Sequence, residues 1–280
     1  MELFDLHCDT PYRCYTENID FWDARLAVSG KKGEVLSNWR QCFAIWIREE
    51  VQNPYNFYKS VLCDFRRKLI SKPCNLTPYF TLEGGSVIDS TDMLYELKND
   101  GIRAINLTWN GENRIAGGVN TDKGLTEFGA GVIKAMNSLK IFCDLSHLNQ
   151  KSFYKAIELS DYPFASHSNC SEICPHPRNL SDRQLKAIGE RGGIIGLCFY
   201  PEFSENDVFE GIYRNIYHIL NLGLENNIAI GSDFDGADMA EKLNGTDKIL
   251  ALYRFLEGKN IEKELLYKIF YGNAVKFFDK

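Results

Sequence analysis

The sequence lacks long apolar runs, an excess of basic residues, internal repeats and low-complexity tracts. No apolar run approaches the roughly 20 residues that a membrane-spanning helix needs, so we expect no membrane segment. The net charge is −6 and charges of both signs are interspersed, which argues against a nucleic-acid-binding surface. Because no linker interrupts the chain, we expect residues 1–280 to form one domain around one large core.

A paired cysteine framework is also missing. The nine cysteines are an odd and scattered set, which is typical of small buried residues in a reducing compartment. Cys170 and Cys174 could be two metal ligands, but no second Cys/His pair follows at zinc-finger spacing. The chain enters an apolar segment at Leu3, which leaves no room for a secretion signal. We therefore expect a cytoplasmic protein.

Short apolar segments alternate with segments of helical pattern along the whole chain. The predicted strands are residues 3–7, 42–47, 79–82, 102–107, 141–145, 164–167, 194–199 and 228–232. The predicted helices are residues 54–70, 91–99, 126–138, 150–159, 181–191, 208–222, 246–257 and 261–278, and Ser181 with Gln184 resembles a capping box. This alternation is typical of an α/β protein, and eight repeats close into a (β/α)8 barrel of the TIM type. Residues 10–38 show neither pattern, and we expect them to form a loop beside the site.

Histidines and carboxylates stand where predicted strands end. His7 and Asp9 end the first strand and Glu83 ends the third. His147 and His167 end the adjacent fifth and sixth strands and together suit a second ion. In a parallel barrel the carboxyl ends of all strands meet at one face, so these side chains should converge. Imidazole and carboxylate ligands suit a hard or borderline divalent metal, and the pattern predicts a metalloenzyme.

Geometry and ligand chemistry indicate roles within this group. Asp5, His7 and Asp9 alternate along one strand and should share a face, with Asp5 deeper, where it could orient a ligand. Glu83 has two carboxylate oxygens and could bridge two cations, which an imidazole cannot do. Each residue could also be an ordinary capping, core or surface residue, and only their joint occurrence favours a metal site.

The last strand and the loop after the sixth strand add further polar groups. Asp233 and Asp235 alternate and should point the same way, and strand eight adjoins strand one, which would place Asp233 beside His7. A carboxylate there can move a proton between water and a leaving group, although a metal ligand or a turn residue is the alternative. Arg178 lies in a proline-rich loop that would hold its guanidinium rigidly, which suits a substrate carboxylate.

In this order the segments resemble the membrane (renal) dipeptidase family of zinc peptidases. The motifs that carry the resemblance are Asp5-Leu6-His7-Cys8-Asp9, Glu83-Gly84-Gly85, Asp144-Leu145-Ser146-His147, Ser166-His167-Ser168, Arg178-Asn179 and Asp233-Phe234-Asp235-Gly236. The resemblance implies a (β/α)8 barrel of the metallo-dependent hydrolase type that holds two Zn²⁺ ions. It implies that His7 and Asp9 bind one ion, that His147 and His167 bind the other, and that Glu83 bridges them.

The resemblance also implies the groups that act on substrate. Arg178 would bind the terminal carboxylate, Asp233 would carry the catalytic proton, and Tyr200 would face the substrate. Mammalian members have a substrate-contacting histidine after the fourth strand, where this sequence has Trp109. An indole N–H donates one hydrogen bond but carries no charge, so Asn110 or a metal ion is expected to steady the developing oxyanion instead.

Taken together, the resemblance implies a binuclear zinc dipeptidase for small dipeptides with free termini, which would tolerate a D-residue at the C-terminal position. A related metal-dependent amidohydrolase acting on a lactam, cyclic amide or phosphoester stays an alternative. A non-catalytic metal-binding protein is a second alternative from another class. Monomer and homodimer are both left open.

Overall fold

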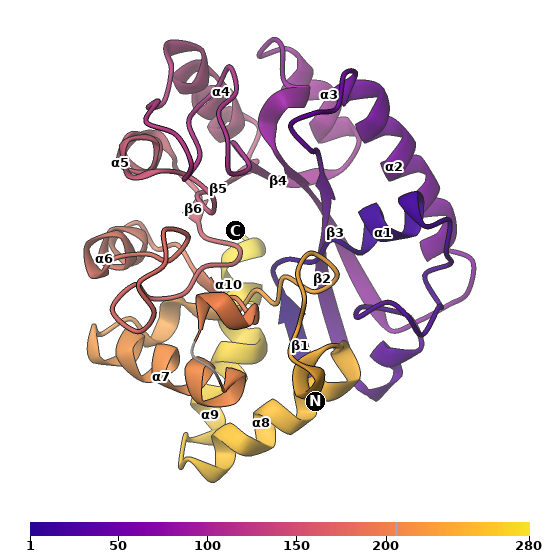
Figure 1. The fold of residues 1–280 in the computed structure, drawn as a ribbon, viewed down its shortest axis with the longest axis vertical. Coiled ribbons are helices and arrows are strands. Elements are labelled where there is room, and N and C mark those ends of the chain that lie inside the picture. Colours follow the sequence, from indigo (N-terminus) through magenta and orange to yellow (C-terminus); the bar gives the residue numbers. More distant parts are fainter. Residues whose placement is uncertain (205–206) are drawn as a thin grey trace.

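Eight parallel strands form one sheet at the centre of the protein (Figure 1). The structure is a computed structural model that describes residues 1–204 and 207–280. The strands are β1 (Glu2–Asp5), β2 (Asn38–Trp46), β3 (Leu76–Glu83), β4 (Ile102–Asn106), β5 (Phe142–Asp144), β6 (Pro163–Phe164), β7 (Ile195–Leu197) and β8 (Ile228–Ile230). Their order is β6-β5-β4-β3-β2-β1-β8-β7.

The two outer strands of this order meet and close the sheet into a barrel. Ala165, directly after β6, forms a parallel bridge with Ile195 of β7. The Ala165 N–H donates to the Ile194 carbonyl at 2.9 Å, and the Gly196 N–H donates to the Ala165 carbonyl at 2.8 Å. The (β/α)8 barrel that the alternating pattern predicts is confirmed, including the neighbouring positions of β1 and β8.

Helices surround the strands and follow the predicted segments closely (Figure 1). The α-helices are α1 (Thr10–Thr16), α2 (Pro54–Leu69), α3 (Met93–Asn99), α4 (Glu127–Ser138), α5 (Gln150–Leu159), α6 (Asp182–Glu190), α7 (Val208–Asn221), α8 (Ile249–Gly258), α9 (Lys263–Tyr267) and α10 (Asn273–Phe278). A π-helical turn, η7 (Lys268–Gly272), joins α9 to α10. Short 3-10 helices are η1 (Lys32–Val35), η2 (Gly85–Val87), η3 (Pro201–Phe203), η4 (Glu225–Asn227), η5 (Glu241–Leu243) and η6 (Thr246–Lys248). None of the helices in the described ranges is both long and apolar enough to cross a bilayer.

Side-chain caps begin several of these helices. The predicted capping box is confirmed at α6, where Ser181 Oγ accepts from the Gln184 N–H and Gln184 Oε1 accepts from the Ser181 N–H. Asn53 accepts from the Asn56 N–H at 3.1 Å before α2, and Pro54 fits the first turn because that turn needs no N–H from it. These caps satisfy backbone donors that a helix start otherwise leaves unpaired.

The expectation of a plain loop over residues 10–38 is wrong in part, because this stretch contains α1 and η1. Helix α1 has seven residues, too few for a repeated apolar face to show in the sequence. It begins with Pro11 in its first turn, and the Tyr12 N–H donates to the Asp9 carbonyl at 3.0 Å. The helix therefore starts directly at a predicted metal ligand.

The last helix closes one end of the barrel. Phe277 and Phe278 of α10 are buried with side chains inside the strand ring, among them Phe4, Phe142 and Phe164. In Figure 1, α10 lies near the centre of the ring of strands. Phe142 is the first residue of β5, so this plug occupies the amino-terminal half of the barrel and leaves the carboxyl ends of the strands for polar residues.

Candidate metal centre

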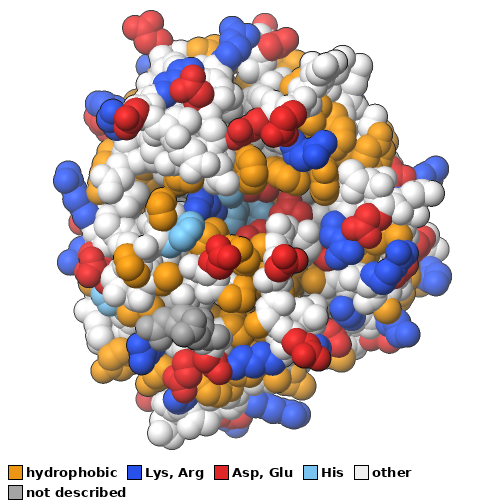
Figure 2. Space-filling model, in the orientation of Figure 1, with side chains coloured by type: hydrophobic (Ala, Val, Ile, Leu, Met, Phe, Trp, Pro, Cys, Tyr) orange, Lys and Arg blue, Asp and Glu red, His pale blue; other side chains and the backbone are white. Residues whose placement is uncertain are grey.

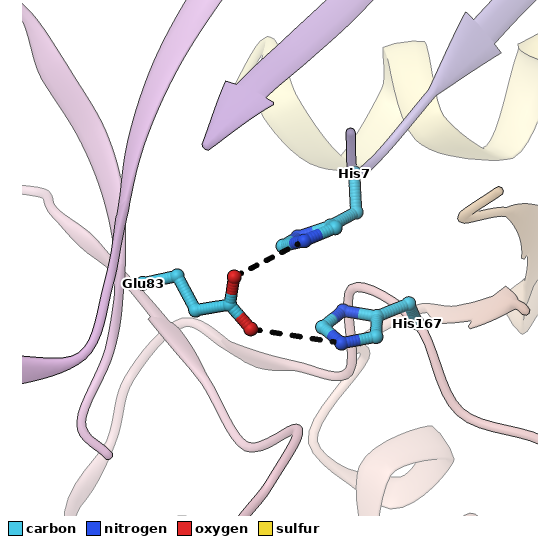
Figure 3. Close-up of side chains that lie close together, drawn as sticks. All are labelled: His7, Glu83 and His167. Atoms are coloured by element: carbon cyan, nitrogen blue, oxygen red, sulfur yellow. Dashed lines mark ion pairs between the residues drawn. The ribbon is translucent and has the colours of Figure 1, made fainter. Parts of the chain in front are cut away.

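Three buried side chains from distant strands meet above the barrel core (Figure 3). His7 follows β1, Glu83 is the last residue of β3 and His167 follows β6. Figure 3 shows the two carboxylate oxygens of Glu83 facing different imidazoles. Glu83 Oε2 lies 3.4 Å from His7 Nε2, and Glu83 Oε1 lies 3.9 Å from His167 Nε2.

Two further predicted ligands join this group. His147 Nε2 lies 2.8 Å from Glu83 Oε1 and 2.9 Å from His167 Nε2. Asp9 Oδ2 lies 3.3 Å from His7 Nε2. The structure thus brings all five predicted ligands together: His7 faces one oxygen of Glu83 and has Asp9 beside it, and the other two histidines lie near the second oxygen.

The donor atoms have the spacing and chemistry that a metal ion requires. With zinc–ligand bonds of about 2.1 Å, two atoms bound to one ion lie roughly 3.0 to 3.4 Å apart. The Nδ1 atoms of His147 and His167 are hydrogen-bonded to Asn110 and Ser166, which leaves their Nε2 atoms facing each other. Asp9 Oδ1 is buried and has no partner in the described part of the chain. One cation beside Asp9 and a second between the two Nε2 atoms would satisfy these groups, so the residues fit the metal that the sequence predicts.

The protonation states of Glu83 and His147 agree with that fit. Burial raises the pKa of Glu83, but the charges and hydrogen bonds of His7 and His147 outweigh it and hold the pKa well below its usual range. Burial, with the nearby Arg178 guanidinium, lowers the pKa of His147 to about 4. An ionised carboxylate and a neutral imidazole are the forms that bind a metal.

A second layer of hydrogen bonds holds the ligand-bearing backbone. Asp5, expected to orient a ligand, is fully buried and accepts from the Ser232 hydroxyl at 2.6 Å and from Gln41 Nε2 at 2.9 Å. It also accepts from the backbone N–H of His7 at 3.3 Å, so it holds the His7 backbone and not its ring. Asp144 accepts from the Ser166 N–H at 2.9 Å, next to His167.

Asp233 and Asp235 do not point the same way, and this expectation is wrong. Strand β8 ends at Ile230, and both aspartates have positive φ (63° and 65°), so the alternation of an extended strand does not reach them. Asp233 Oδ1 lies 3.9 Å from His7 Nε2, as predicted. Asp235 turns away and accepts from Thr10 Oγ1 at 2.6 Å and from Arg13 Nη1 at 3.0 Å.

A cavity of about 850 Å³ opens above the cluster. Figure 2 shows it as a hollow in the face of the molecule, with histidine and basic side chains inside it. The predicted site residues that line it are Asp9, Glu83, Trp109, Asn110, His147, Arg178, Tyr200 and Asp233. Arg13, Arg25 and Lys32 line it too, which confirms the prediction that residues 10–38 form a wall of the site.

Arg178 is a buried cation that forms no ion pair with any of the described residues. The residue is 5% exposed. Its Nη2 donates to the His167 carbonyl at 3.4 Å, and its guanidinium lies 5.5 Å from the centre of the Phe203 ring. Its Nε has no hydrogen-bond partner in residues 1–204 and 207–280. Burial lowers the pKa of Arg178, and an anion bound in the cavity would offset that cost.

The remaining predicted residues form the cavity wall. The Trp109 ring packs edge-on against Trp46, with ring centres 5.2 Å apart, and its centre lies 6.3 Å from that of His147. Tyr200 is half-buried and packs edge-on against Phe203, with ring centres 5.0 Å apart. Asn110 Oδ1 lies 2.8 Å from His147 Nδ1, which places this side chain beside a predicted ligand.

Sequence reasoning missed several residues of the site. Ser166 contacts His167 Nδ1 at 2.6 Å, and its place inside the Ser166-His167-Ser168 motif could have indicated this. The Cys198 thiol lies 3.7 Å from Asp233 Oδ2, and Trp46 ends β2 on the cavity wall. Neither Cys198 nor Trp46 has a signal in the sequence, because only the closure of the barrel brings them to the site.

The chain is similar in sequence to the membrane dipeptidase family and in fold to solved metallopeptidases. The model of the membrane dipeptidase family (peptidase family M19) matches residues 64–280. An uncharacterised protein of Klebsiella pneumoniae is 35% identical over 192 residues, which are 63% of this chain and 71% of that protein. An uncharacterised dipeptidase of Schizosaccharomyces pombe is 33% identical over 189 residues, which are 64% of this chain but only 45% of that protein.

Solved structures share the fold over the whole chain. A metallo peptidase from Rhodobacter sphaeroides, liganded with a phosphinate mimic of the dipeptide L-Ala-D-Ala, superposes with a TM-score of 0.91 at 23% identity. The match covers 100% of this chain and 99% of that structure. A dipeptidase of family M19 superposes with a TM-score of 0.87 at 24% identity, covering 100% and 98% of the two chains.

Proposed function

Since the chain belongs to the membrane dipeptidase family, peptidase family M19, we propose that it is a binuclear zinc dipeptidase. One observation carries this proposal. Glu83 faces His7 with one carboxylate oxygen and His147 with the other, at 3.4 and 2.8 Å. A single carboxylate between two sets of nitrogen and oxygen donors suits two ions that share one bridging ligand.

The chain's own residues would hold the ions as follows. His7 and Asp9 would bind one ion, His147 and His167 would bind the other, and Glu83 would bind both. When bound, the ions supply Lewis acidity and a site where water loses a proton near neutral pH. Burial of the five side chains excludes bulk water and strengthens each electrostatic contact.

Asp233 is the proposed proton carrier. It borders the cluster, and burial raises the pKa of its carboxyl group to about 6. A carboxyl group with a pKa near the working pH can accept a proton and then donate it to a departing amine.

Arg178 is the proposed anchor for the terminal carboxylate of the substrate. Its buried guanidinium has no acidic partner in the described chain, and a bidentate carboxylate would supply one. With the free amino group held at the metal end of the cavity, two anchors fix the length of the substrate to a dipeptide. Trp109, Asn110 and Tyr200 would contact the residues between these anchors, and Trp109 would narrow the substrate range.

The proposal includes a D-residue at the C-terminal position and one catalytic domain. The Rhodobacter sphaeroides peptidase with its L-Ala-D-Ala mimic supports the first point by analogy only. The second is supported by the barrel, whose strands run from Glu2 to Ile230 and whose end is closed by α10.

The test is a paired measurement of metal content and substrate range on the purified protein. We expect two equivalents of zinc and hydrolysis of L-Ala-D-Ala, but not of the matched tripeptide or of the C-terminally amidated dipeptide. Full activity with one equivalent of zinc would contradict the bridged centre. Two bound zinc ions with no activity on any dipeptide would favour a related amidohydrolase that acts on a lactam, cyclic amide or phosphoester.

A further inference from the structure

We propose that Asn110 is a positioning residue for His147 that also offers a hydrogen-bond donor to the substrate, an inference that rests on the proposed metal centre. Asn110 lies in the loop after β4, and His147 lies after β5. Asn110 Oδ1 is 2.8 Å from His147 Nδ1. Asn110 is half-buried and lines the cavity, so one end of its amide faces the histidine and the other is available to a ligand.

This contact selects the metal-binding form of His147. A carbonyl oxygen only accepts, so the imidazole proton must be on Nδ1 when Asn110 Oδ1 faces it. His147 Nε2 then presents its lone pair toward Glu83 and His167. With the Asn110 amide reversed, an N–H would face Nδ1 and the proton would move to Nε2, where it would block a metal ion.

The other histidine of this pair has a less selective partner. His167 Nδ1 contacts the Ser166 hydroxyl at 2.6 Å, and a hydroxyl can both donate and accept. The Ser166 contact therefore fits either tautomer of His167. The Asn110 amide is the partner that distinguishes the two tautomers at this end of the cluster.

The backbone around Asn110 and His147 fixes their separation. The Asn120 N–H donates to the Asn110 carbonyl and the Val119 N–H donates to the His147 carbonyl, each at 2.9 Å. The close approach of the two loops at these hydrogen bonds requires a glycine at position 118, because a Cβ there would lie 2.2 Å from the Trp109 carbonyl oxygen. His147 itself has a positive φ of 69°, which is costly for a non-glycine residue and persists only under such support.

The amide nitrogen of Asn110 forms no hydrogen bond with a described residue, whereas its oxygen is engaged by His147. A free N–H on the cavity wall can donate to a substrate carbonyl or to the negative charge that develops on it. One side chain would thereby tie metal binding to substrate binding.

Two substitutions separate the two roles. Asn110→Asp keeps an acceptor for His147 Nδ1 and removes the N–H donor, and Asn110→Ala removes both. We expect Asn110→Ala to bind the zinc assigned to His147 and His167 about 10- to 100-fold less tightly, measured by competition with a chromophoric chelator. Asn110→Asp should bind zinc at least as tightly as the wild type, yet kcat/KM on L-Ala-D-Ala should fall about 100-fold.

The control is Asn244→Ala, which makes the same change on the cavity lining at a residue without a hydrogen bond to any ligand histidine. Its zinc affinity should equal that of the wild type. A thermal melt of each variant checks that it is folded. Unchanged zinc affinity in folded Asn110→Ala would overturn the positioning role, and unchanged kcat/KM in Asn110→Asp would overturn the donor role.

A measurement on the zinc-free protein tests the role of Asn110 separately from the proposed function. Nitrogen-15 NMR of the zinc-free protein should show a proton on His147 Nδ1 in the wild type and in Asn110→Asp, whereas in Asn110→Ala Nδ1 should lose this proton to Nε2, which faces Glu83. An unprotonated Nδ1 in the wild type would overturn the inference. If the wild type binds no zinc, the proposed metal centre fails while the NMR result still decides the role of Asn110.

Discussion

The Nε2 atoms of His147 and His167 lie 2.9 Å apart inside the protein, with their Nδ1 atoms engaged by other partners. Two neutral imidazoles that face each other with lone pairs repel, and burial removes the water that would otherwise separate them. The pair is stable only with a shared proton or a cation between the nitrogens, so the free energy of folding should depend on the metal.

Metal removal should therefore lower the stability of the fold. A ligand that binds only the folded state at 1,000 times its Kd adds about 4 kcal/mol to the free energy of unfolding. For a chain of this size we expect chelation to lower Tm by roughly 10 °C, and added zinc to restore it. Differential scanning calorimetry before and after dialysis against a chelator measures this, with magnesium as the control ion. An identical Tm with and without zinc would speak against a structural contribution of the metal.

Asp233→Asn should keep both metals and lose turnover. The amide is nearly isosteric but cannot carry a proton in the way a carboxyl group does, so kcat should fall by about 100-fold or more. Metal analysis and kcat on the same preparation make the distinction. Near-normal turnover would mean that another group carries the proton, and loss of zinc would mean that Asp233 is a ligand.

Arg178→Ala should raise KM for dipeptides much more than it lowers kcat. The variant loses a buried cation that has no ion pair within the described residues and that a substrate carboxylate would pair with, so ground-state and transition-state binding weaken together. The matched control is a C-terminally amidated dipeptide tested as a competitive inhibitor, which wild type and variant should bind alike. An equal loss of affinity for both compounds would contradict the anchor role.

Asp235→Ala should destabilise the fold while the metal content stays unchanged. The carboxylate accepts from the backbone N–H groups of Ala27 and Val28 at 2.8 and 3.1 Å, besides Thr10 and Arg13. Removing it leaves these donors unpaired at a cost of about 2 to 4 kcal/mol in the free energy of unfolding. Urea unfolding measures the loss, and Asp238→Ala, at an exposed position nearby, should stay within about 0.5 kcal/mol of the wild type.

Gly231→Ala should be poorly tolerated for a steric reason. A Cβ at this position would lie 1.7 Å from the Ser166 carbonyl oxygen, where the ends of the last strands approach closely. Overpacking of this kind costs about 3 kcal/mol or more. Gly258→Ala is the opposite case, because nothing lies within 4 Å of its Cβ and the residue ends helix α8. That variant should gain about 0.5 to 1 kcal/mol in urea unfolding, and a gain at Gly231 would refute the packing argument.

The sequence by itself determined the barrel and the strand ends that carry its polar residues. Apolar runs and helical periodicity are local properties, and parallel strands necessarily bring their carboxyl ends to one face. For that reason His7, Glu83 and His167 could be expected to meet although they are far apart in the chain. Caps such as Ser181 with Gln184 are equally local, and they too were predictable.

Only the tertiary structure decided how these side chains are directed. Asp233 and Asp235 look equivalent in the sequence, but both have positive φ. As a result Asp233 faces the predicted metal ligand His7, whereas Asp235 faces Thr10 in the segment after β1. The contact of Asn110 with His147 depends on the path of the loop through residues 118–120. Such directions depend on backbone dihedral angles and on contacts between distant segments, which a pattern of residue types does not contain.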